Sequence, residues 1–439
     1  MKYTEAEVIQ FVRENNVKFI RLMFCDIFGR IKNLSIMPEE LERAFSEGIS
    51  FDGSALQGFQ GSEASDLFLY PDPSTLAVLP WRPSRGRVVR LHCRICYPDG
   101  RPYENDSRSI LYQTAKRLEE AGFRCQIGPE CEFYLFNLDD KGEPTKVPQD
   151  RGGYCDIEPL DRGENLRREI CLTLEDMGLQ PESSHHEQGP GQNEIGFKYQ
   201  ECCQAADDLM TFRSLVKALA AQSGLHACFM PKPLPGYSGS GLHINLSLLR
   251  QGKNLFASAD PADRQIVESF LAGILERIRE ITVFLNPLTN SYRRFGAFEA
   301  PGYVSWGQKN RSQLIRIPAA AGELSRMELR SPDPAANPYL AFALVAEAGL
   351  EGIQRQLPLA APRGDNLYLL NDSQSAGLLK LPATLGEALA LAAESSFIRQ
   401  VLPETLVRPY LKAKDEEWQA CRQAPDQLLW EEMQYFSYI

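Results

Sequence analysis

The feature that most limits the fold of this chain is a set of short segments in which acidic and apolar residues alternate. In GPECEFYLF, Glu130 and Glu132 stand two residues apart, and Cys131, Phe133 and Leu135 are apolar. Because side chains alternate across a strand, residues two apart lie on the same face. The segment therefore predicts a strand that has one face in a core and carries carboxylates on the other.

Three later segments, GLHINLSLL, RMELR and QNEIGF, alternate in the same way. Their polar positions are His243, Asn245, Ser247, Arg326, Glu328, Arg330 and Glu194. An ordinary sheet with one solvated face is the alternative, and it predicts a mixture of lysine, threonine, serine and glutamate on that face. Glutamates, one histidine and arginines stand there instead, so we expect the polar faces to converge on a site.

The segment HHEQGPGQNEI adds a further carboxylate, and it contains no lysine or arginine. The candidate metal ligands are then five carboxylates and one imidazole: Glu130, Glu132, Glu187, Glu194, Glu328 and His243. Converging carboxylates repel one another unless a cation lies between them. Oxygen-rich ligation favours Mg²⁺ or Mn²⁺ over Zn²⁺, so we expect two such ions. Since His185 and His186 are adjacent, at most one of them faces the same site.

Six arginines crowd into fewer than forty residues before and around RMELR. They are Arg293, Arg294, Arg311, Arg316, Arg326 and Arg330. Guanidinium groups bind phosphates and carboxylates through paired hydrogen bonds, and metals with arginines are the usual equipment for phosphoryl transfer. The chain lacks a G-x-x-x-x-G-K-[ST] loop, so a bound nucleotide would lie on a different fold from the P-loop proteins.

Composition excludes several other classes. At 439 residues the chain predicts two or three domains. A net charge of −11 without a basic run argues against a nucleic-acid partner. No apolar run approaches a membrane span, and the N-terminus is acidic, so we expect a cytoplasmic protein without a membrane partner. The eleven cysteines, including the pair Cys93 and Cys96, are expected to be reduced core residues.

The turn-rich segment YPDGRPYENDSR, residues 97–108, predicts the domain boundary, with Ser107 capping the next helix. Apolar stripes at helical spacing predict helices near 107–121, 164–177, 205–223, 261–284 and 337–353. Residues 138–158 are expected to form an exposed loop.

With these segments placed, the chain resembles type I glutamine synthetases over nearly its whole length. The matching stretches are FIRLMFCDIFGRIKN, FDGS, VLPW, GPECEFYLF, HHEQGPGQNEI, FMPKPL, GSGLHINLSL, NRSQLIRIP and MELRSPDPAANPYLAFA. The resemblance implies an α+β fold. An N-terminal beta-grasp domain (residues 1–103) would precede a large catalytic domain (residues 104–439) with a curved antiparallel sheet flanked by helices.

The resemblance also implies a role for each site residue. Glu132, Glu187 and Glu194 would hold one metal, and Glu130, His243 and Glu328 the other. Gly239, Arg294 and Arg330 would bind glutamate, while Arg311, Arg316 and Arg326 would face the nucleotide phosphates, with Glu182, Asn245 and Ser247 contacting the nucleotide. Asp52 would serve the ammonium site of a neighbouring subunit, and Glu299 would belong to a mobile flap.

The activity implied is ATP-dependent ligation of ammonia to the side-chain carboxylate of L-glutamate through γ-glutamyl phosphate, with Mg²⁺ or Mn²⁺. The implied assembly is a homo-dodecamer of two six-membered rings. The C-terminal MQYFSYI would either join the rings or pack on its own subunit.

Several positions depart from the family pattern. Ser238 replaces an asparagine, Ala55 replaces a serine, and RFGAFE is one residue short between Arg294 and Glu299. These changes cluster around glutamate and ammonia, so a ligase that joins glutamate to a larger amine is the nearest alternative. A catalytically silent regulator is another, although the presence of all six metal ligands counts against it.

Overall fold

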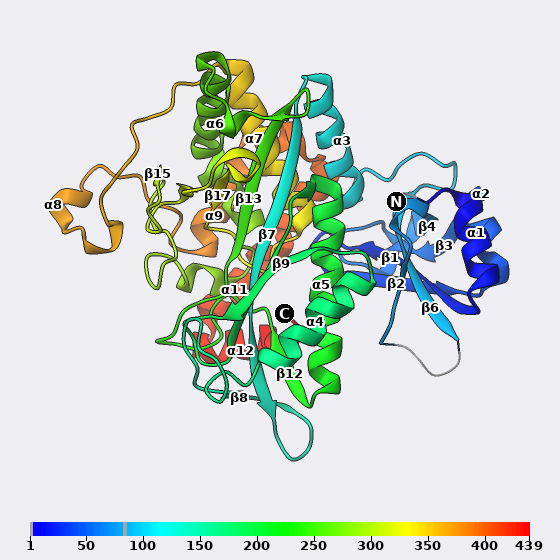
Figure 1. The fold of residues 1–439 in the computed structure, drawn as a ribbon. Coiled ribbons are helices and arrows are strands. Elements are labelled where there is room, and N and C mark those ends of the chain that lie inside the picture. The colour runs from blue at the N-terminus through cyan, green and yellow to red at the C-terminus, as the bar shows by residue number, and fades with distance from the viewer. Residues whose placement is uncertain (1–2, 82–85) are drawn as a thin grey trace.

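Two sheets organise the chain, and the computed structural model describes residues 3–81 and 86–439 of it. The N-terminal sheet has six strands in the order β2-β1-β6-β4-β3, with β5 beside β6. Its strands are β1 (Val17–Cys25), β2 (Ile31–Ile36), β3 (Ile49–Asp52), β4 (Asp66–Pro71), β5 (Ala77–Val78) and β6 (Arg87–Cys96). Figure 1 shows this sheet as a separate blue body to the right of the larger part.

The helix α1 (Glu5–Glu14) opens the chain with the capping box at Thr4, whose side chain accepts from the Glu7 amide. The helix α2 (Leu41–Ser46) follows β2. Apolar side chains from these helices and from the strands form a core of their own, with Val8, Ile20 and Leu91 completely buried. The N-terminal part thus buries its own apolar residues, as a separate domain requires.

The larger sheet has eleven strands, and its main path runs β15-β16-β17-β13-β7-β10-β9. They are β7 (Arg124–Leu138), β8 (Pro144–Pro148), β9 (Pro181–His186), β10 (Gln192–Phe197), β11 (Gln200–Glu201), β12 (Leu225–Cys228), β13 (Leu242–Arg250), β14 (Lys253–Asn254), β15 (Trp306–Gln308), β16 (Ile315–Ile317) and β17 (Met327–Leu329). Among the described residues, the strand pairs of this sheet are antiparallel except β15 with β16. The long strands β7 and β13 run side by side through the middle of Figure 1.

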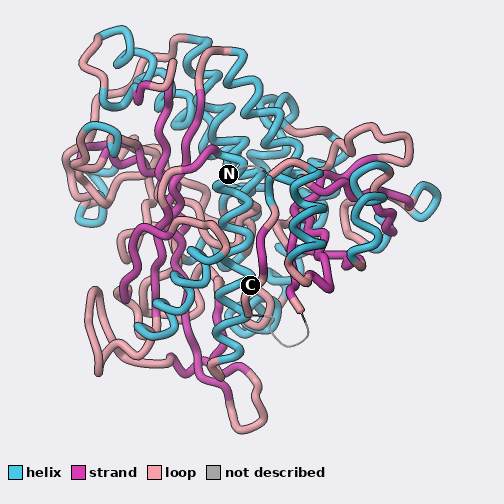
Figure 2. The backbone as a smooth tube through the Cα atoms, turned by 45° about the vertical axis from the view of Figure 1, so that its right-hand side comes forward, coloured by secondary structure: helices cyan, strands magenta, loops and turns pink. Residues whose placement is uncertain are grey.

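The larger part of the chain has ten α-helices among the described residues, and they cover the apolar side of the sheet except for α8, which lies apart at the far left of Figure 1. They are α3 (Ser107–Glu120), α4 (Glu164–Asp176), α5 (Cys202–Gln222), α6 (Pro261–Leu285), α7 (Pro338–Arg355), α8 (Asp372–Ser375), α9 (Leu385–Glu394), α10 (Ser396–Val401), α11 (Glu404–Gln423) and α12 (Gln427–Tyr435). In Figure 2 the long magenta strands lie to the left and most of the cyan helices to their right. The five helices expected from apolar periodicity are confirmed, each within three residues at either end.

Two local expectations are wrong. The side chain of Asp106, not Ser107, caps α3, since it accepts from the Arg108 amide while Ser107 is fully buried in the first turn. Residues 138–158 are not all loop, because β8 pairs with the end of β7. Its two prolines suggested a loop, yet proline is tolerated at a sheet edge.

The C-terminal residues pack against other parts of the same chain. The backbone amide of Phe229 donates to the Ile439 carbonyl at 3.0 Å, and Lys217 Nζ donates to the Tyr438 carbonyl at 2.7 Å. The ring of Phe436 packs edge-on against Phe136. The tail therefore packs as an ordinary C-terminal segment within the single chain. Within residues 3–81 and 86–439, no helix is both long enough and apolar enough to cross a membrane.

Candidate metal and anion site

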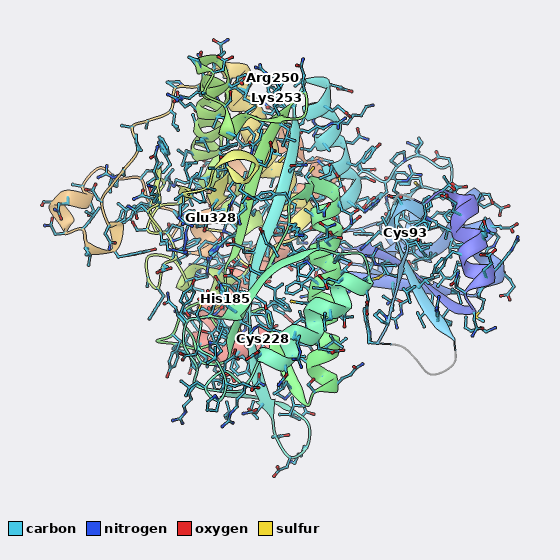
Figure 3. The ribbon with its side chains drawn as sticks, in the orientation of Figure 1. Cys93, His185, Cys228, Arg250, Lys253 and Glu328 are labelled. Carbon is cyan, nitrogen blue, oxygen red and sulfur yellow. The ribbon has the colours of Figure 1, made fainter. Side chains whose placement is uncertain are left out.

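Strand register brings the acidic faces together. His243 of β13 pairs with Glu130 of β7, and Glu194 of β10 pairs with Glu132 of β7. Side chains of directly opposed residues lie about 5 Å apart on the same face. On the other side of β13, Glu328 of β17 lies opposite Asn245. Figure 3 labels Glu328 and His185 on this sheet, whereas Cys93 lies far away in the N-terminal domain.

These faces open into a cavity of about 600 Å³. The predicted site residues that line it are Glu130, Glu132, Glu187, Glu194, Gly239, His243, Arg294, Glu299, Arg311, Arg316, Arg326 and Arg330. Glu328 contacts one of these lining residues, since its Oε1 lies 3.6 Å from His243 Nδ1. The convergence that alternation predicts is therefore present. A larger cavity of about 940 Å³ lies nearby, but it contains none of the predicted ligands.

Two groups of possible ligands stand out within the acidic cluster. Glu130, Glu194 and His243 bring ligand atoms within 4.8 Å of one another, and so do His185, Glu187 and Glu194. Glu194 belongs to both groups and thus lies between two potential ion positions. This grouping differs from the partition implied by the resemblance, in which Glu194 serves one ion and His185 neither.

The electrostatics of the cluster indicate missing positive charge. Burial and the neighbouring Glu132 raise the pKa of Glu187 to about 8. Burial and four other glutamates raise the pKa of Glu194 well above its usual range. Burial also opposes ionisation of Glu130, but the hydrogen bond to His243 prevails and lowers its pKa to about 2. Divalent cations would let all these carboxylates ionise together.

One imidazole nitrogen of the acidic cluster also lacks a hydrogen-bond partner. The Nδ1 atom of His185 is buried without a hydrogen bond in the structure. A buried polar atom left without a partner costs about 1–3 kcal/mol, so it calls for an explanation. Imidazole nitrogens and carboxylate oxygens are ligands for divalent ions, so a bound ion would give this nitrogen a partner.

The arginines supply binding groups for anions. Arg316 Nη1 lies 2.6 Å and Arg330 Nη1 3.2 Å from Glu328. Their Nε atoms are buried and have no hydrogen-bond partner, although both residues line the cavity. Such N–H groups remain available for a carboxylate or phosphate. Arg294 is held in place by donating to the carbonyls of Ser331 and Arg330 at 2.7 and 3.1 Å.

Two glycines let the loop before β13 approach this arginine. A Cβ on Gly239 would lie 2.6 Å from Arg294 Cγ and 2.5 Å from the Pro231 carbonyl oxygen. A Cβ on Gly241 would lie 2.9 Å from both Arg294 Nη2 and His243 Nε2. Any larger residue would therefore displace groups that line the cavity.

The segment RFGAFE lies over the cavity in a strained conformation. Phe298 and Glu299 have φ of 49° and 64°, values that are uncommon for residues with a side chain. The Glu299 carbonyl accepts from Arg330 Nη2 at 3.0 Å, and its carboxylate lies 4.0 Å from Arg311. The ring of Phe298 lies under Lys232 Nζ at 4.3 Å. Residues 296–298 are exposed to solvent, as the tip of a movable cover requires.

The structure does not bring every predicted site residue to the cavity. Asp52 is exposed at the end of β3, in the N-terminal domain. Glu182 is exposed on β9 and does not line the cavity. Asn245 and Ser247 are buried on the same face of β13 as His243, where Asn245 accepts from Arg326 Nε at 2.8 Å.

Sequence reasoning missed one residue that organises the site. Gln192 donates from Nε2 to Glu132 Oε2 at 3.0 Å and to the Gly239 carbonyl at 3.1 Å. Ser238 donates to its Oε1. Gln192 stands two residues before Glu194, so the same alternation could have placed it on the polar face. His185 lines the cavity while His186 is buried against Asp150, which confirms that only one of the pair faces the site.

Comparisons with known proteins cover almost the whole chain. The model of the glutamine synthetase beta-grasp domain matches residues 16–98, and that of the glutamine synthetase catalytic domain matches residues 104–433. The first match confirms the beta-grasp fold; limits at residues 103 and 104 remain a prediction. A glutamine synthetase of Methanosarcina mazei is 46% identical over 420 residues, 94% of each chain. One of Staphylococcus epidermidis is 43% identical over 99% of this chain and 98% of its own.

Solved structures agree with the same fold. A complex of GmaS with ADP superposes with a TM-score of 0.87 at 29% identity, over 97% of this chain and 98% of its own. The glutamine synthetase of Plasmodium falciparum gives a TM-score of 0.86 at 24% identity, over the same shares of the two chains. These likenesses confirm the α+β architecture.

Proposed function

Because this chain belongs to the glutamine synthetase family and makes glutamine from glutamate, ammonia and ATP, we propose that the acidic cavity is where that ligation occurs. The observation that carries the proposal is the meeting of five glutamates, one histidine and a set of arginines on adjoining strands. Family membership implies the use of ATP and divalent metal ions. The residue roles that follow are part of the proposal.

We assign the divalent ions to Glu130, Glu132, Glu187, Glu194, His243 and Glu328. The oxygen-rich donor set favours Mg²⁺ or Mn²⁺. When bound, such ions supply positive charge opposite the oxygens of the transferring phosphoryl group. His185 is an additional candidate, because its unpartnered Nδ1 belongs to the group around Glu187 and Glu194.

We assign the arginines of the cavity to the two anionic substrates, glutamate and ATP. Arg294 and Arg330, beside Gly239, would bind the glutamate carboxylate, since both are almost fully buried and line the cavity. Arg311, Arg316 and Arg326 would face the nucleotide phosphates. Asn245 and Ser247, on β13 beside Arg326, and Glu182, on β9, would contact the rest of the nucleotide. The ADP complex of the structurally similar GmaS supports a nucleotide in this fold.

In the proposed reaction, the side-chain carboxylate of glutamate attacks the terminal phosphorus of ATP and ADP leaves. Arg311 offsets the charge of the transferring group. Ammonia then attacks the carbonyl carbon of the acyl phosphate, and phosphate leaves with the bonding electrons. Glu299 and its segment would exclude water, which would otherwise hydrolyse the acyl phosphate.

Asp52 would bind ammonium at the cavity of a neighbouring subunit and would accept a proton from that ammonium ion. Its exposed carboxylate at the edge of the N-terminal domain is available to a second copy of the chain. The hydrogen bonds from Ser54 lower the pKa of Asp52, so it is anionic at neutral pH. We therefore propose a homo-oligomer, a dodecamer of two hexameric rings. A cytoplasmic location accords with its eleven free cysteines.

A second candidate function differs from the first in its nitrogen donor, which would be a larger amine in place of ammonia. Ser238 holds Gln192 where the family carries asparagine, and the short flap places Phe298 over the cavity. A γ-glutamyl-amine ligase would accept a larger donor at these positions. Measuring ADP release with glutamate and either ammonium or a panel of alkylamines separates the two. We expect ammonium to give the highest kcat/KM; turnover with a large amine alone would overturn the glutamine assignment.

A catalytically silent relative is the remaining alternative, and the same assay addresses it. Release of ADP that depends on both glutamate and a divalent ion excludes a purely regulatory role. Absence of any such turnover, in protein that binds ATP and is fully assembled, would contradict our proposal.

A further inference from the structure

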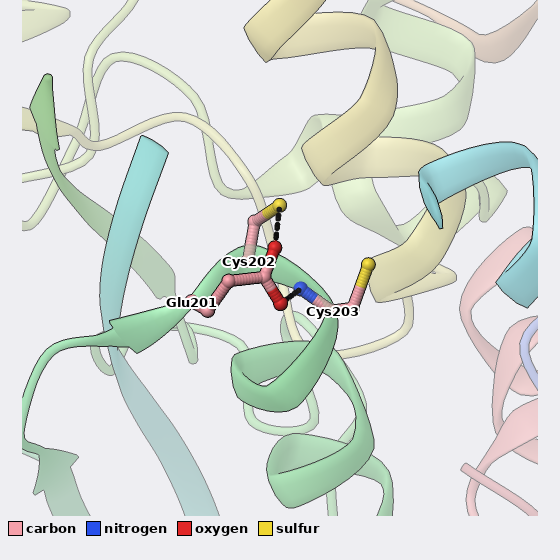
Figure 4. A group of neighbouring side chains, drawn as sticks. All are labelled: Glu201, Cys202 and Cys203. Atoms are coloured by element: carbon pink, nitrogen blue, oxygen red, sulfur yellow. Dashed lines mark hydrogen bonds between the residues drawn. The ribbon is translucent and has the colours of Figure 1, made fainter. Parts of the chain in front are cut away.

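A second cluster of metal-binding side chains lies outside the catalytic cavity, at the start of α5. Glu201, Cys202 and Cys203 bring one ligand atom each within 4.8 Å of one another. Figure 4 shows the Glu201 carboxylate bonded to both cysteines. The Cys202 thiol donates to Glu201 Oε1 at 3.0 Å, and the Cys203 amide donates to Oε2 at 3.0 Å.

Helix capping explains only part of this arrangement. Glu201 Oε2 accepts the free amides of the first turn, which is the task of a capping side chain. The other oxygen faces a thiol, and the next residue supplies a second thiol. Among the residues that the structure describes, Glu201 has no lysine or arginine as an ion-pair partner.

The cysteines of this group are thiols in the absence of an ion. Contact with the Cys203 side chain, together with burial and the nearby Glu201 carboxylate, raises the pKa of Cys202 well above its usual range. A bound divalent cation would have to displace the thiol protons, which is the usual course of metal binding by cysteine. Cys125, on the neighbouring strand β7, is not part of the group.

These donors differ in kind from those of the catalytic cavity. The cavity offers oxygen atoms and imidazole, whereas this cluster offers two sulfur atoms and one carboxylate oxygen. Thiolate ligands select soft d¹⁰ ions such as Zn²⁺ and Cd²⁺ and discriminate against Mg²⁺. We propose that Glu201, Cys202 and Cys203 form a soft-metal site separate from the catalytic ions.

Binding proceeds by proton displacement. Each thiol gives its proton to solvent as its sulfur bonds to the ion, so that two thiolates and Glu201 surround a divalent cation. Cys203 is partly exposed and Glu201 is exposed, which leaves a route from solvent. Because β11 pairs with β7 just before Glu130, the ion would also fix the start of the strand that carries the catalytic carboxylates.

The test is a Cd²⁺ titration of the reduced, chelator-treated full chain in excess Mg²⁺, which occupies the oxygen-rich sites. Thiolate-to-cadmium charge-transfer absorption in the ultraviolet reports binding to sulfur. We expect one saturable step of one Cd²⁺ per subunit, reversed by Zn²⁺. The variant Cys203→Ser is expected to weaken that step at least about tenfold, as Glu201→Gln does to a smaller extent.

Cys171→Ser, on α4, is the matched control, because Cys171 is also partly exposed but belongs to no such group. It should leave the step intact. Glutamine formation with Mg²⁺ checks that every variant is folded, since none of these residues lines the cavity. An unchanged step in Cys203→Ser, or no saturable step in the unaltered protein, would overturn the proposal.

Discussion

At the scale of single residues, the site depends on groups that orient its carboxylates without binding an ion or substrate. Glu132 is held through Oε2 by the Gly241 amide at 2.9 Å and by Gln192 at 3.0 Å. Gln192 is held in turn by Ser238. Since one carboxylate oxygen is fixed by the protein, the other can face the cavity in a defined direction.

The first prediction concerns Gln192. Replacing it with alanine removes a donor from a buried carboxylate, so Glu132 loses its fixed orientation. We expect Gln192→Ala to lower the affinity for the divalent ion, so that half-maximal activity requires an ion concentration about tenfold to a hundredfold higher. Activity measured against Mg²⁺ and Mn²⁺ concentration checks it. Gln188→Ala is the control at the rim of the same cavity; equal effects of the two changes would contradict the positioning role.

A second prediction concerns Gly241. The added methyl group of Gly241→Ala would lie 2.9 Å from Arg294 and His243, and both groups must then move. A displacement of about 1 Å in an active site costs on the order of a hundredfold in rate. We expect kcat/KM to fall by about that factor with little change in melting temperature. Gly364→Ala, where a Cβ meets nothing within 4 Å, should behave like the unaltered enzyme.

Alternation along the sequence was enough to predict which residues lie on the polar faces of the strands, whereas the convergence of those faces was an expectation that the structure confirms. Glu130, Glu194 and Glu328 each follow from period-two spacing next to buried apolar positions. The role of Gln192 was missed because its partners, Glu132 and Gly239, lie 60 and 47 residues away along the chain. Such contacts depend on strand register, which one sequence does not display.

At the scale of elements, α5 carries two adjacent aspartates in opposite protonation states, and one of them connects α5 to α3 and α7. Asp207 accepts from Arg108 at 2.8 Å and from the Tyr339 hydroxyl at 2.7 Å. Burial opposes its charge, but Arg108 prevails and holds the pKa of Asp207 well below its usual range. Burial raises the pKa of Asp208 to about 7, with a hydrogen bond from Gln204 acting in the other direction.

These states predict opposite effects of two similar changes. The folded chain keeps a proton on Asp208 up to about pH 7, whereas the unfolded chain loses it near pH 4. Asp208 therefore lowers stability progressively as pH rises through this window. We expect Asp208→Asn to stabilise the protein by about 1–4 kcal/mol near pH 8 and by little near pH 4.

Asp207→Asn is the matched comparison. It leaves Arg108 buried without its full counter-charge, so we expect a loss of about 3–5 kcal/mol near neutral pH. Urea unfolding of both variants at several pH values measures the two effects. A pH-independent gain in Asp208→Asn would show that its charge is not the cause.

Helices were the elements most readily predicted, because their apolar stripes repeat over several turns. The helix α5 begins at Cys202, three residues before the expected start, since Glu201 caps it and glutamate is not a usual cap. The short strand β8 was missed because only its partner, β7, makes it a strand. Local patterns predict elements that carry their own signal and miss those defined by a neighbour.

At the scale of the whole molecule, the proposed ammonium site requires two subunits. Asp52 ends β3, in the N-terminal domain at the right of Figure 1, whereas the cavity is lined by residues of β7 and β13, the strands in the middle of that figure. In the proposed ring, the N-terminal domain of one subunit would reach the cavity of the next.

Mixed assemblies test this arrangement. Asp52→Ala and Glu328→Ala should each abolish activity while leaving assembly intact. When the two variants are co-expressed and assemble at random, roughly a quarter of the sites regain both residues from adjacent subunits. We expect that fraction of activity to return. No recovery, in assemblies shown to contain both variants, would indicate that Asp52 does not act across the boundary.

The central claim is that converging glutamates of one sheet hold two divalent ions beside the buried arginines. The most direct measurement is anomalous diffraction from crystals grown with Mn²⁺, ADP and a phosphinate analogue of the acyl phosphate. We predict two manganese peaks per subunit, with Glu194 near both and with the analogue between the ions and Arg330. Peaks located elsewhere, with Glu130, Glu194 and Glu328 bound to water alone, would contradict the account.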